Sequence, residues 1–183
     1  KFAEKSNFRC LIAHEMGLGK TIIALASLKL HPELLPCIIV CKSNLTAQWF
    51  VEIHRWTGKI AQVITKSTDD PEPNFFDIFI VSYDMLRRVS DKLKNAGSIK
   101  TIIFDETQMI KNTGAARTRY ALDLCQKADH VIGLSGTPIK NHAGEYYPIL
   151  HAIMPERFLT QAGFFRMHVA GYYDRFGNPH VGG

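Results

Sequence analysis

The chain alternates short apolar runs with longer segments in which apolar residues recur every three or four positions. The short runs are rich in β-branched residues and predict strands at 10–13, 37–41, 60–65, 77–82, 101–104 and 130–134. Because these runs are apolar almost throughout, we expect both faces of each strand to be buried, as in a parallel sheet. The longer segments predict helices at 20–30, 45–56, 84–94, 115–127 and 143–153. This order is typical of an α/β protein with a mainly parallel sheet and helices on both faces.

The predicted helix at 45–56 has the clearest apolar stripe. Leu45, Trp49, Ile53 and Trp56 recur at steps of four and three, which places them on one side of a helix. We therefore expect both tryptophans to lie in the core.

Length and charge add only broad limits. A chain of 183 residues is long enough for one sizeable domain with its own core. The net charge is 22 − 17 = +5, and the segment 84–127 alone holds nine basic and five acidic side chains. Such a surplus suits a polyanionic partner, although a solvated face is the commoner explanation of a charge excess. The aromatic and glycine-rich tail at 171–183 has neither helical nor strand periodicity, so its structure stays open.

The cysteines bear on the cellular compartment. Cys10, Cys37, Cys41 and Cys125 form no C-x-x-C pair, and the first three border or lie in apolar strand-like runs. We expect buried free thiols, which favour a reducing intracellular location over a disulfide framework or a zinc site. The first nine residues lack the apolar centre of a signal peptide, and no apolar run approaches the roughly 18 residues of a membrane helix.

A phosphate-binding loop is predicted where the first strand meets the first long helix. Residues 14–21 read His-Glu-Met-Gly-Leu-Gly-Lys-Thr, which keeps the P-loop spacing although His14 stands at its first glycine position. The Lys20 ammonium would reach the β- and γ-phosphates of ATP, and the Thr21 hydroxyl would ligate Mg²⁺. The alternative is an ordinary glycine-containing turn with an exposed lysine. The residues expected to hold the nucleotide are Glu15, Met16, Gly17, Leu18, Gly19, Lys20 and Thr21.

An acidic pair follows the predicted strand at 101–104. Ligands bind at the carboxyl edge of a parallel sheet, so Asp105 and Glu106 are placed to face the phosphate loop. Asp105 would hold Mg²⁺ through its water shell, and Glu106 would deprotonate the water that attacks the γ-phosphate. Taken alone, the pair could equally cap a following helix.

With these residues in place, the sequence resembles the N-terminal motor lobe of the SNF2 family of DNA-dependent ATPases, within helicase superfamily two. The segment 15–21 is similar to motif I, 38–56 to motif Ia and 80–86 to motif Ib. Phe104 to Asn112 resembles the DEAH-type motif II, and 133–141 with the sequel at 155–158 resembles motif III. The resemblance implies a RecA-like P-loop NTPase lobe over 1–170. Residues 171–183 would then begin a connection or insertion toward a second lobe outside the chain.

The family also implies roles for individual residues. The loops after two strands would contact the DNA backbone through Lys42, Ser43, Ser82 and Tyr83. The residues expected to couple the nucleotide site to the DNA track are Gln108, Ser135, Gly136 and Thr137. Residues 135–138 could also cap a helix, and Lys42 and Tyr83 could be plain loop surface.

Three residues depart from the family pattern without removing a catalytic group. His14 stands where Asp is usual, Gln108 where many members have His, and Lys140 where Gln is frequent.

The resemblance favours a lobe that binds ATP and Mg²⁺ and couples hydrolysis to movement on double-stranded DNA, in remodelling or strand annealing. Because the second lobe supplies the arginine fingers, we expect this chain alone to hydrolyse ATP poorly. The alternatives are a nucleic-acid binding or scaffold module with decayed catalysis and a P-loop small-molecule kinase. The location would be cytoplasmic for a bacterial or phage source, favoured by the short segments between motifs, and nuclear for a eukaryotic one.

Overall fold

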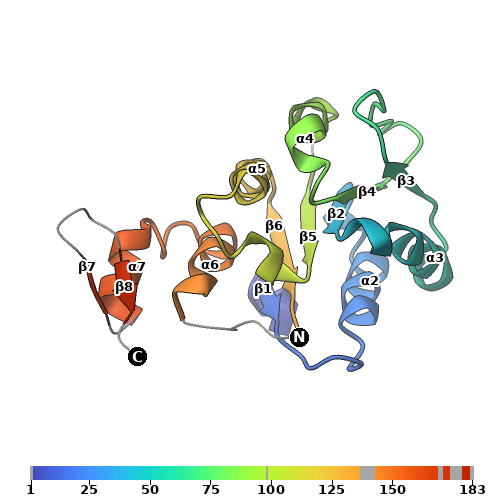
Figure 1. Ribbon diagram of the computed structural model, residues 1–183. Coiled ribbons are helices and arrows are strands. Elements are labelled where there is room, and N and C mark those ends of the chain that lie inside the picture. The colour runs from blue at the N-terminus through green and yellow to red at the C-terminus, as the bar shows by residue number, and fades with distance from the viewer. Residues whose placement is uncertain (1, 98, 137–142, 169–170, 174–178, 182–183) are drawn as a thin grey trace.

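The computed structural model describes residues 2–97, 99–136, 143–168, 171–173 and 179–181. Its centre is a six-stranded sheet in which neighbouring strands run parallel, in the order β1-β6-β5-β2-β4-β3 (Figure 1). All six predicted strands are confirmed to within one residue at each end. They are β1 (Arg9–Ile12), β2 (Cys37–Cys41), β3 (Ala61–Ile64), β4 (Ile78–Ser82), β5 (Thr101–Asp105) and β6 (His130–Leu134).

The predicted helices also form, with one change at a start. The helices are α1 (Phe2–Lys5), α2 (Lys20–Leu30), α3 (Thr46–Thr57), α4 (Leu86–Asn95), α5 (Ala116–Cys125), α6 (Tyr147–Ile153) and α7 (Gln161–His168). The helix predicted at 143–153 begins as the 3₁₀ turn η4 (Ala143–Tyr146) and becomes α-helical from Tyr147. Pro148 lies in the first turn of α6, where its missing N–H breaks no helical bond. Within the described ranges, no helix is long and apolar enough to cross a membrane.

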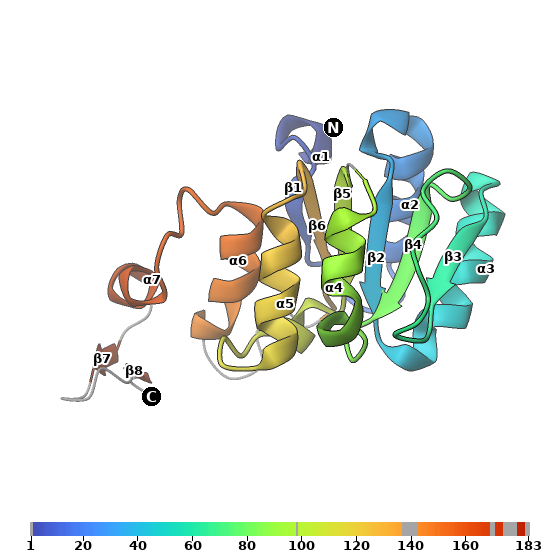
Figure 2. The same ribbon diagram turned by 90° about the horizontal axis from the view of Figure 1, so that it is seen from above.

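Helices cover both faces of the sheet, as predicted. Successive residues of a strand point to opposite faces, and in β2 Ile38 and Val40 join one core cluster while Ile39 joins the other. The first cluster is completed by α4, α5 and α6, which lie side by side on one face in Figure 2. The second is completed by α2 and α3. The two clusters together account for the continuous burial of the strands.

The two tryptophans of α3 differ in depth. Trp49 is buried within the second core cluster, as expected, but Trp56 is only half-buried at its margin. The Trp56 indole N–H donates a 2.6 Å hydrogen bond to Glu52. The prediction of a core position is therefore wrong in depth for Trp56, which lies in the last turn of the helix.

The chain after α6 forms a small separate layer. Tyr147, Phe158, Phe164 and Phe165 make a third apolar cluster, which packs α7 against the start of α6. Two short strands, β7 (Gly171–Tyr173) and β8 (Pro179–Val181), then pair antiparallel at one end of the molecule (Figure 1).

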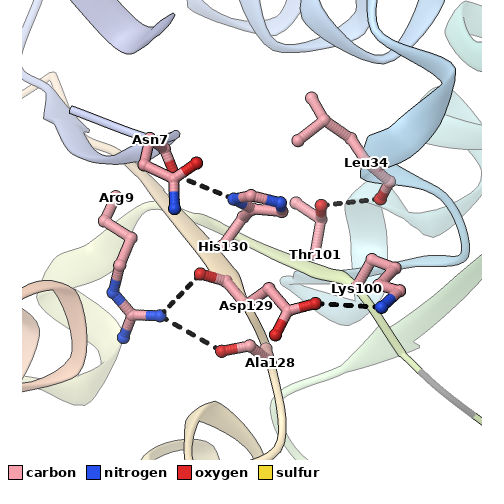
Figure 3. A network of polar contacts seen from close by, with 8 residues as sticks. All are labelled: Asn7, Arg9, Leu34, Lys100, Thr101, Ala128, Asp129 and His130. Carbon is pink, nitrogen blue, oxygen red and sulfur yellow. Dashed lines mark hydrogen bonds and ion pairs between the residues drawn. The ribbon is translucent and has the colours of Figure 1, made fainter. Parts of the chain in front are cut away.

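Arg9 ties the sheet to two helices at the amino edge. Its Nη1 donates to the carbonyl oxygens of Ala128 and Asp129, just after α5, at 3.1 and 2.9 Å (Figure 3). Its Nε and Nη2 donate to those of Ile153 and Ala152, at the end of α6, each at 2.7 Å. One guanidinium thus satisfies two carbonyls that the end of α6 leaves without an internal partner and joins them to the loop between α5 and β6.

Candidate nucleotide-binding site

The loop between β1 and α2 has the backbone that its glycines allow. Gly17 has φ +81° and Gly19 has φ +73°, in the left-handed region that glycine adopts readily. No heavy atom lies within 4 Å of where a Cβ at Gly17 would be, so the backbone angle and not crowding calls for glycine there. Gly19 directly precedes α2 and has no side chain to cap that helix, so the N-terminal end of α2 faces the loop.

The side chain of Lys20, the first residue of α2, reaches back to this loop. Its Nζ donates to the carbonyl oxygens of His14 and Glu15, each at 2.9 Å. His14 contributes to this contact through its main chain, which any residue at that position would supply. The departure from the family pattern at His14 therefore leaves the setting of the Lys20 ammonium intact.

A pocket of about 390 Å³ opens beside the loop and brings the predicted groups together. Lys20 and Thr21, from the start of α2, face the same space as Asp105 and Glu106, from the end of β5. Parallel strands put the ends of β1 and β5 at one edge, which explains how residues so distant in sequence meet. The lining residues are Met16, Gly17, Gly19, Lys20, Thr21, Ile22, Leu45, Gln48, Trp49, Glu52, Asp105 and Glu106.

Asp105 is held by two aromatic side chains. The Trp49 indole N–H donates to its Oδ2 at 2.9 Å, and the Tyr83 hydroxyl donates to its main-chain oxygen at 2.8 Å. Burial raises the pKa of the Asp105 carboxyl, and the neighbouring Glu106 adds to this, while the Trp49 hydrogen bond and the Lys20 charge lower it. The net upward shift describes a carboxylate that a cation in the pocket would stabilise.

Glu106 has an unusual backbone. Its φ is +55°, which costs energy for a residue with a side chain and marks a constrained position. Gln108 donates a hydrogen bond through Nε2 to the Glu106 carboxylate. The Ser135 hydroxyl in turn donates to Oε1 of Gln108 at 3.1 Å. The structure thus joins two of the expected coupling residues to Glu106.

Gly136 brings the segment after β6 against the phosphate loop. A Cβ at this position would lie 3.1 Å from Cγ of Met16 and 3.4 Å from Nζ of Lys20. A side chain here would therefore require the Met16 side chain to shift by a few tenths of an ångström. The fourth expected coupling residue, Thr137, lies outside the described residues.

The expected DNA contacts divide into two groups. Lys42 is half-buried and Ser43 is exposed, both just after β2 at the carboxyl edge of the sheet. Ser82 and Tyr83 are buried, with 6% and 2% of their surface exposed. These two side chains therefore offer little surface to a DNA backbone, and the Tyr83 hydroxyl is already bonded to the Asp105 main-chain oxygen.

The basic segment at 84–127 is also less free than its charge count indicates. Four of its lysines pair with carboxylates: Lys92 with Asp70, Lys94 with Asp91 and Asp123, Lys100 with Asp129, and Lys111 with Glu145. Arg87 and Arg88, in the first turn of α4, are exposed. These two arginines put accessible positive charge beside the end of β4, next to the buried Tyr83, and Arg117, Arg119 and Lys127 of the same segment are exposed as well.

Sequence reasoning missed the part that α3 plays in the pocket. Leu45, Gln48, Trp49 and Glu52 all line it. Helical periodicity placed Trp49 on the apolar stripe, but a residue on that stripe can also reach the pocket when the helix starts beside it. No motif spacing in the sequence signals this contact.

The oxygen donors suit a magnesium ion that arrives with a nucleotide. Among the described residues, no group of three or more His, Cys, Asp and Glu could hold a metal by itself. Mg²⁺ is usually bound by one or two protein oxygens together with substrate phosphates and water. The Thr21 hydroxyl and the Asp105 carboxylate, both in the pocket, fit that mode.

The parallel sheet, the glycine loop before α2 and the acidic pair across the edge define a P-loop nucleotide-binding lobe of the RecA-like type. Residues 2–172 match the family model of the SNF2-related domain, so the chain belongs to this family.

Named relatives agree with this family. The human DNA annealing helicase and endonuclease ZRANB3 is 32% identical over 96% of the chain, which spans 17% of that protein. The Caenorhabditis elegans homolog of SWI/SNF-related matrix-associated actin-dependent regulator of chromatin subfamily A-like protein 1 is 33% identical over 96% of the chain and 26% of its own length. The chain thus spans well under a third of these relatives.

The fold agrees as well. The Sulfolobus solfataricus SWI2/SNF2 ATPase core, solved in complex with double-stranded DNA, superposes with a TM-score of 0.76 and 26% identity. This similarity covers 90% of the chain and 35% of the Sulfolobus core.

Proposed function

We propose that this chain is the N-terminal ATP-binding lobe of a DNA-dependent ATPase that couples ATP hydrolysis to movement on double-stranded DNA, in remodelling or strand annealing. The observation that carries the proposal is the convergence of Lys20, Thr21, Asp105 and Glu106 on one pocket beside the N-terminus of α2. Membership of the SNF2-related family and the fold shared with the Sulfolobus core support it.

The phosphates of ATP would bind at the loop before α2. The Lys20 ammonium is held within the loop by two carbonyl oxygens, close to where the phosphates of ATP would lie. The start of α2 adds unpaired backbone N–H groups and the positive end of its dipole. Thr21 and Asp105 would hold Mg²⁺, which when bound neutralises charge on the phosphates.

Glu106 is the group placed to activate water. Glu106 lines the pocket, and the Gln108 amide donates a hydrogen bond to its carboxylate, which favours one orientation. A fixed carboxylate can accept a proton from the water that attacks the γ-phosphate. A shift of Ser135, which follows β6, would then change the orientation of this carboxylate through Gln108.

The DNA path would follow the carboxyl edge of the sheet. Lys42 and Ser43 lie after β2, and the exposed Arg87 and Arg88 start α4 nearby in the fold. Arginine and lysine side chains at such an edge can bind phosphate oxygens without reading the base sequence. Arg87 and Arg88 would then make the phosphate contacts that the buried side chains of Ser82 and Tyr83 do not reach.

The nucleotide part is tested with two variants of the chain. Lys20→Ala should lose most of its affinity for a fluorescent ATP analogue, whereas Glu106→Gln should bind the analogue normally and lose hydrolysis by about 10²-fold or more. Lys127→Ala removes an exposed positive charge just after α5 and should change neither property. Unchanged binding by Lys20→Ala, or normal hydrolysis by Glu106→Gln, would overturn these roles.

The DNA part is tested by salt dependence. Replacing Lys42, or Arg87 and Arg88 together, with alanine should weaken binding to duplex DNA and reduce the slope of log affinity against log salt. The charge-matched control is the double replacement of Lys29, in the last turn of α2, and Lys127, just after α5. Both lysines are exposed and lie at the opposite edge of the sheet. Equal losses in both sets would contradict the proposed path.

The rate of hydrolysis tests whether this lobe acts alone. The described sheet forms one lobe, and arginine fingers of P-loop enzymes can contribute about 10³ to 10⁵ in rate. We therefore expect slow turnover by the 183-residue chain, with or without duplex DNA. Fast DNA-stimulated turnover would show that the chain supplies all the groups that hydrolysis requires. DNA binding without any ATP binding would favour the scaffold module instead.

A further inference from the structure

Asp105 is fixed by contacts from two elements that precede it in the chain. The Trp49 indole N–H from α3 holds the carboxylate at 2.9 Å, and the Tyr83 hydroxyl after β4 holds the main-chain oxygen at 2.8 Å. Trp49 is 3% exposed and Tyr83 is 2% exposed, so neither donor has water as a ready alternative. The carboxylate and the main-chain oxygen of Asp105 are therefore each held by a different donor.

The Trp49 contact is stiff. The indole can only donate, and its ring packs in the core cluster with Ile53 of α3 and Ile80 of β4. Turning the ring relative to α3 would require the core to repack, which close-packed interiors resist, so the indole can move only together with its helix. The indole thus sets one position for the Asp105 carboxylate, at the place where it lines the nucleotide pocket.

The same helix starts at the surface loop proposed to contact DNA. The Leu45 N–H donates to the Lys42 carbonyl at 2.9 Å, and the Thr46 hydroxyl donates to the Ser43 carbonyl at 3.0 Å. These bonds join the loop to the first turn of α3, and Trp49 lies within one further turn. A displacement of Lys42 and Ser43 would therefore move the indole with the helix end.

We infer that Trp49 is a positioning residue for Asp105, and that its hydrogen bond carries the effect of DNA contact at Lys42 and Ser43 to the metal-binding carboxylate. This inference rests on the proposed function. It gives the tryptophan of α3 a role beyond packing and explains why the pocket draws on that helix.

The test compares two tryptophans of one helix. Trp49→Phe removes the indole N–H and keeps an aromatic ring. Trp56→Phe removes the other indole N–H, whose partner is Glu52, and leaves Asp105 untouched. Mn²⁺ binding is measured by electron paramagnetic resonance with a non-hydrolysable ATP analogue present, and analogue binding is measured separately in EDTA.

We expect Trp49→Phe to weaken Mn²⁺ binding about tenfold, as the loss of one hydrogen bond to a charged group can do. Analogue affinity in EDTA should be unchanged, and Trp56→Phe should bind Mn²⁺ like the unmodified chain. Duplex DNA should alter Mn²⁺ affinity in the unmodified chain and in Trp56→Phe but not in Trp49→Phe. Equal behaviour of the two variants, or no DNA effect in the unmodified chain, would overturn the inference while leaving the nucleotide site standing.

A second measurement is made on the unmodified chain and so does not depend on whether a variant folds. In the unmodified chain labelled with ¹⁵N at the indoles, the Trp49 N–H signal should shift when Mg²⁺ and the analogue are added, and the Trp56 signal should not. The Trp56→Phe spectrum identifies the two signals. An unmoved Trp49 signal in a chain that binds the analogue would refute the positioning role. Failure of the chain to bind the analogue at all would refute the proposed function as well.

Discussion

The Ser135 hydroxyl donates a 3.1 Å hydrogen bond to Oε1 of Gln108, whose amide donates onward to the Glu106 carboxylate. The three residues come from the ends of β5 and β6, two neighbouring strands of the sheet. An amide that accepts from a hydroxyl and donates to a carboxylate has its orientation fixed at both ends. Gln108 can therefore fill the linking position that many family members give to histidine.

Removing the Ser135 hydroxyl, which starts this series of hydrogen bonds, should slow hydrolysis without affecting ATP binding. A neutral hydrogen bond contributes about 1 kcal/mol, so we expect Ser135→Ala to reduce the rate about five- to tenfold. Single-turnover hydrolysis with protein in excess over ATP measures this step even when turnover is slow. Ser6→Ala removes a hydroxyl that donates to the Ala3 carbonyl and does not line the nucleotide pocket, and this variant should hydrolyse normally. A full rate in Ser135→Ala would show that Glu106 is oriented without this link.

Gly133 should be intolerant of a side chain. A Cβ there would lie 2.9 Å from Cγ2 of Thr107, 3.0 Å from Cδ1 of Leu11 and 3.2 Å from Cδ1 of Ile149. Overpacking of this kind typically costs about 1–3 kcal/mol, so Gly133→Ala should lower the free energy of unfolding by that amount in urea melts. Gly114→Ala, where the nearest atom is the Asn112 side-chain oxygen at 3.4 Å, is the control. Equal stability of the two variants would contradict the crowding around β6.

The strands and most helix bounds could be predicted because burial on both faces leaves a direct mark on the sequence. Strands such as β2, which is buried at every position, read as continuous apolar runs, here bounded by Pro36 and Lys42. Helix α7 was not predicted, because its packing depends on Phe158 and Tyr147, which lie outside the helix. Its apolar residues acquire meaning only once α6 is in place.

The site was predictable where its chemistry needs a fixed local spacing, as at Lys20 and Thr21. The Asp105 partners were not, because Trp49 and Tyr83 reach it from distant parts of the chain. Periodicity gave the side of α3 on which Trp49 lies but not what its indole N–H would meet. Position after a strand made Tyr83 look like a loop surface, whereas its buried hydroxyl reaches past β2 to the end of β5 and donates to the Asp105 main-chain oxygen.

The buried thiols should make stability fall at alkaline pH. Burial raises the pKa of Cys125 to about 12, and burial with the nearby Asp105 charge raises the pKa of Cys41 to about 12 as well. An unfolded cysteine has a pKa of about 8.5. Folding therefore favours the protonated thiols, and this contribution is complete below about pH 8.5 and is lost as pH rises toward 12.

Urea melts between pH 7.5 and 10.5 would measure this loss. Because lysines and tyrosines also begin to titrate in this range, the comparison is with Cys41→Ala/Cys125→Ala, whose stability should fall less steeply with pH. Parallel pH profiles for the two chains would contradict the prediction. All four cysteines are buried and free, so thiol reagents at pH 8 should label them only after denaturant is added.

Arg9 should be among the strongest single contributions to stability outside the core. Its guanidinium donates four hydrogen bonds of 2.7 to 3.1 Å to carbonyl oxygens after α5 and at the end of α6. Arg9→Ala leaves those carbonyls without their charged donor, and we expect a loss of about 2–4 kcal/mol in the free energy of unfolding. Arg9→Lys keeps the charge but has no planar fork to reach both helices, so it should recover less than half of the loss.

The control for Arg9 is Lys127→Ala, which removes an exposed positive charge from the same edge of the sheet and should cost less than about 0.5 kcal/mol. Because Arg9 lies at the amino end of β1 and the nucleotide pocket at the carboxyl end, ATP-analogue affinity should be unchanged in any Arg9 variant that remains folded. Full recovery by lysine would show that charge near the helix ends, and not the forked geometry of the guanidinium, holds α5 and α6 against the sheet.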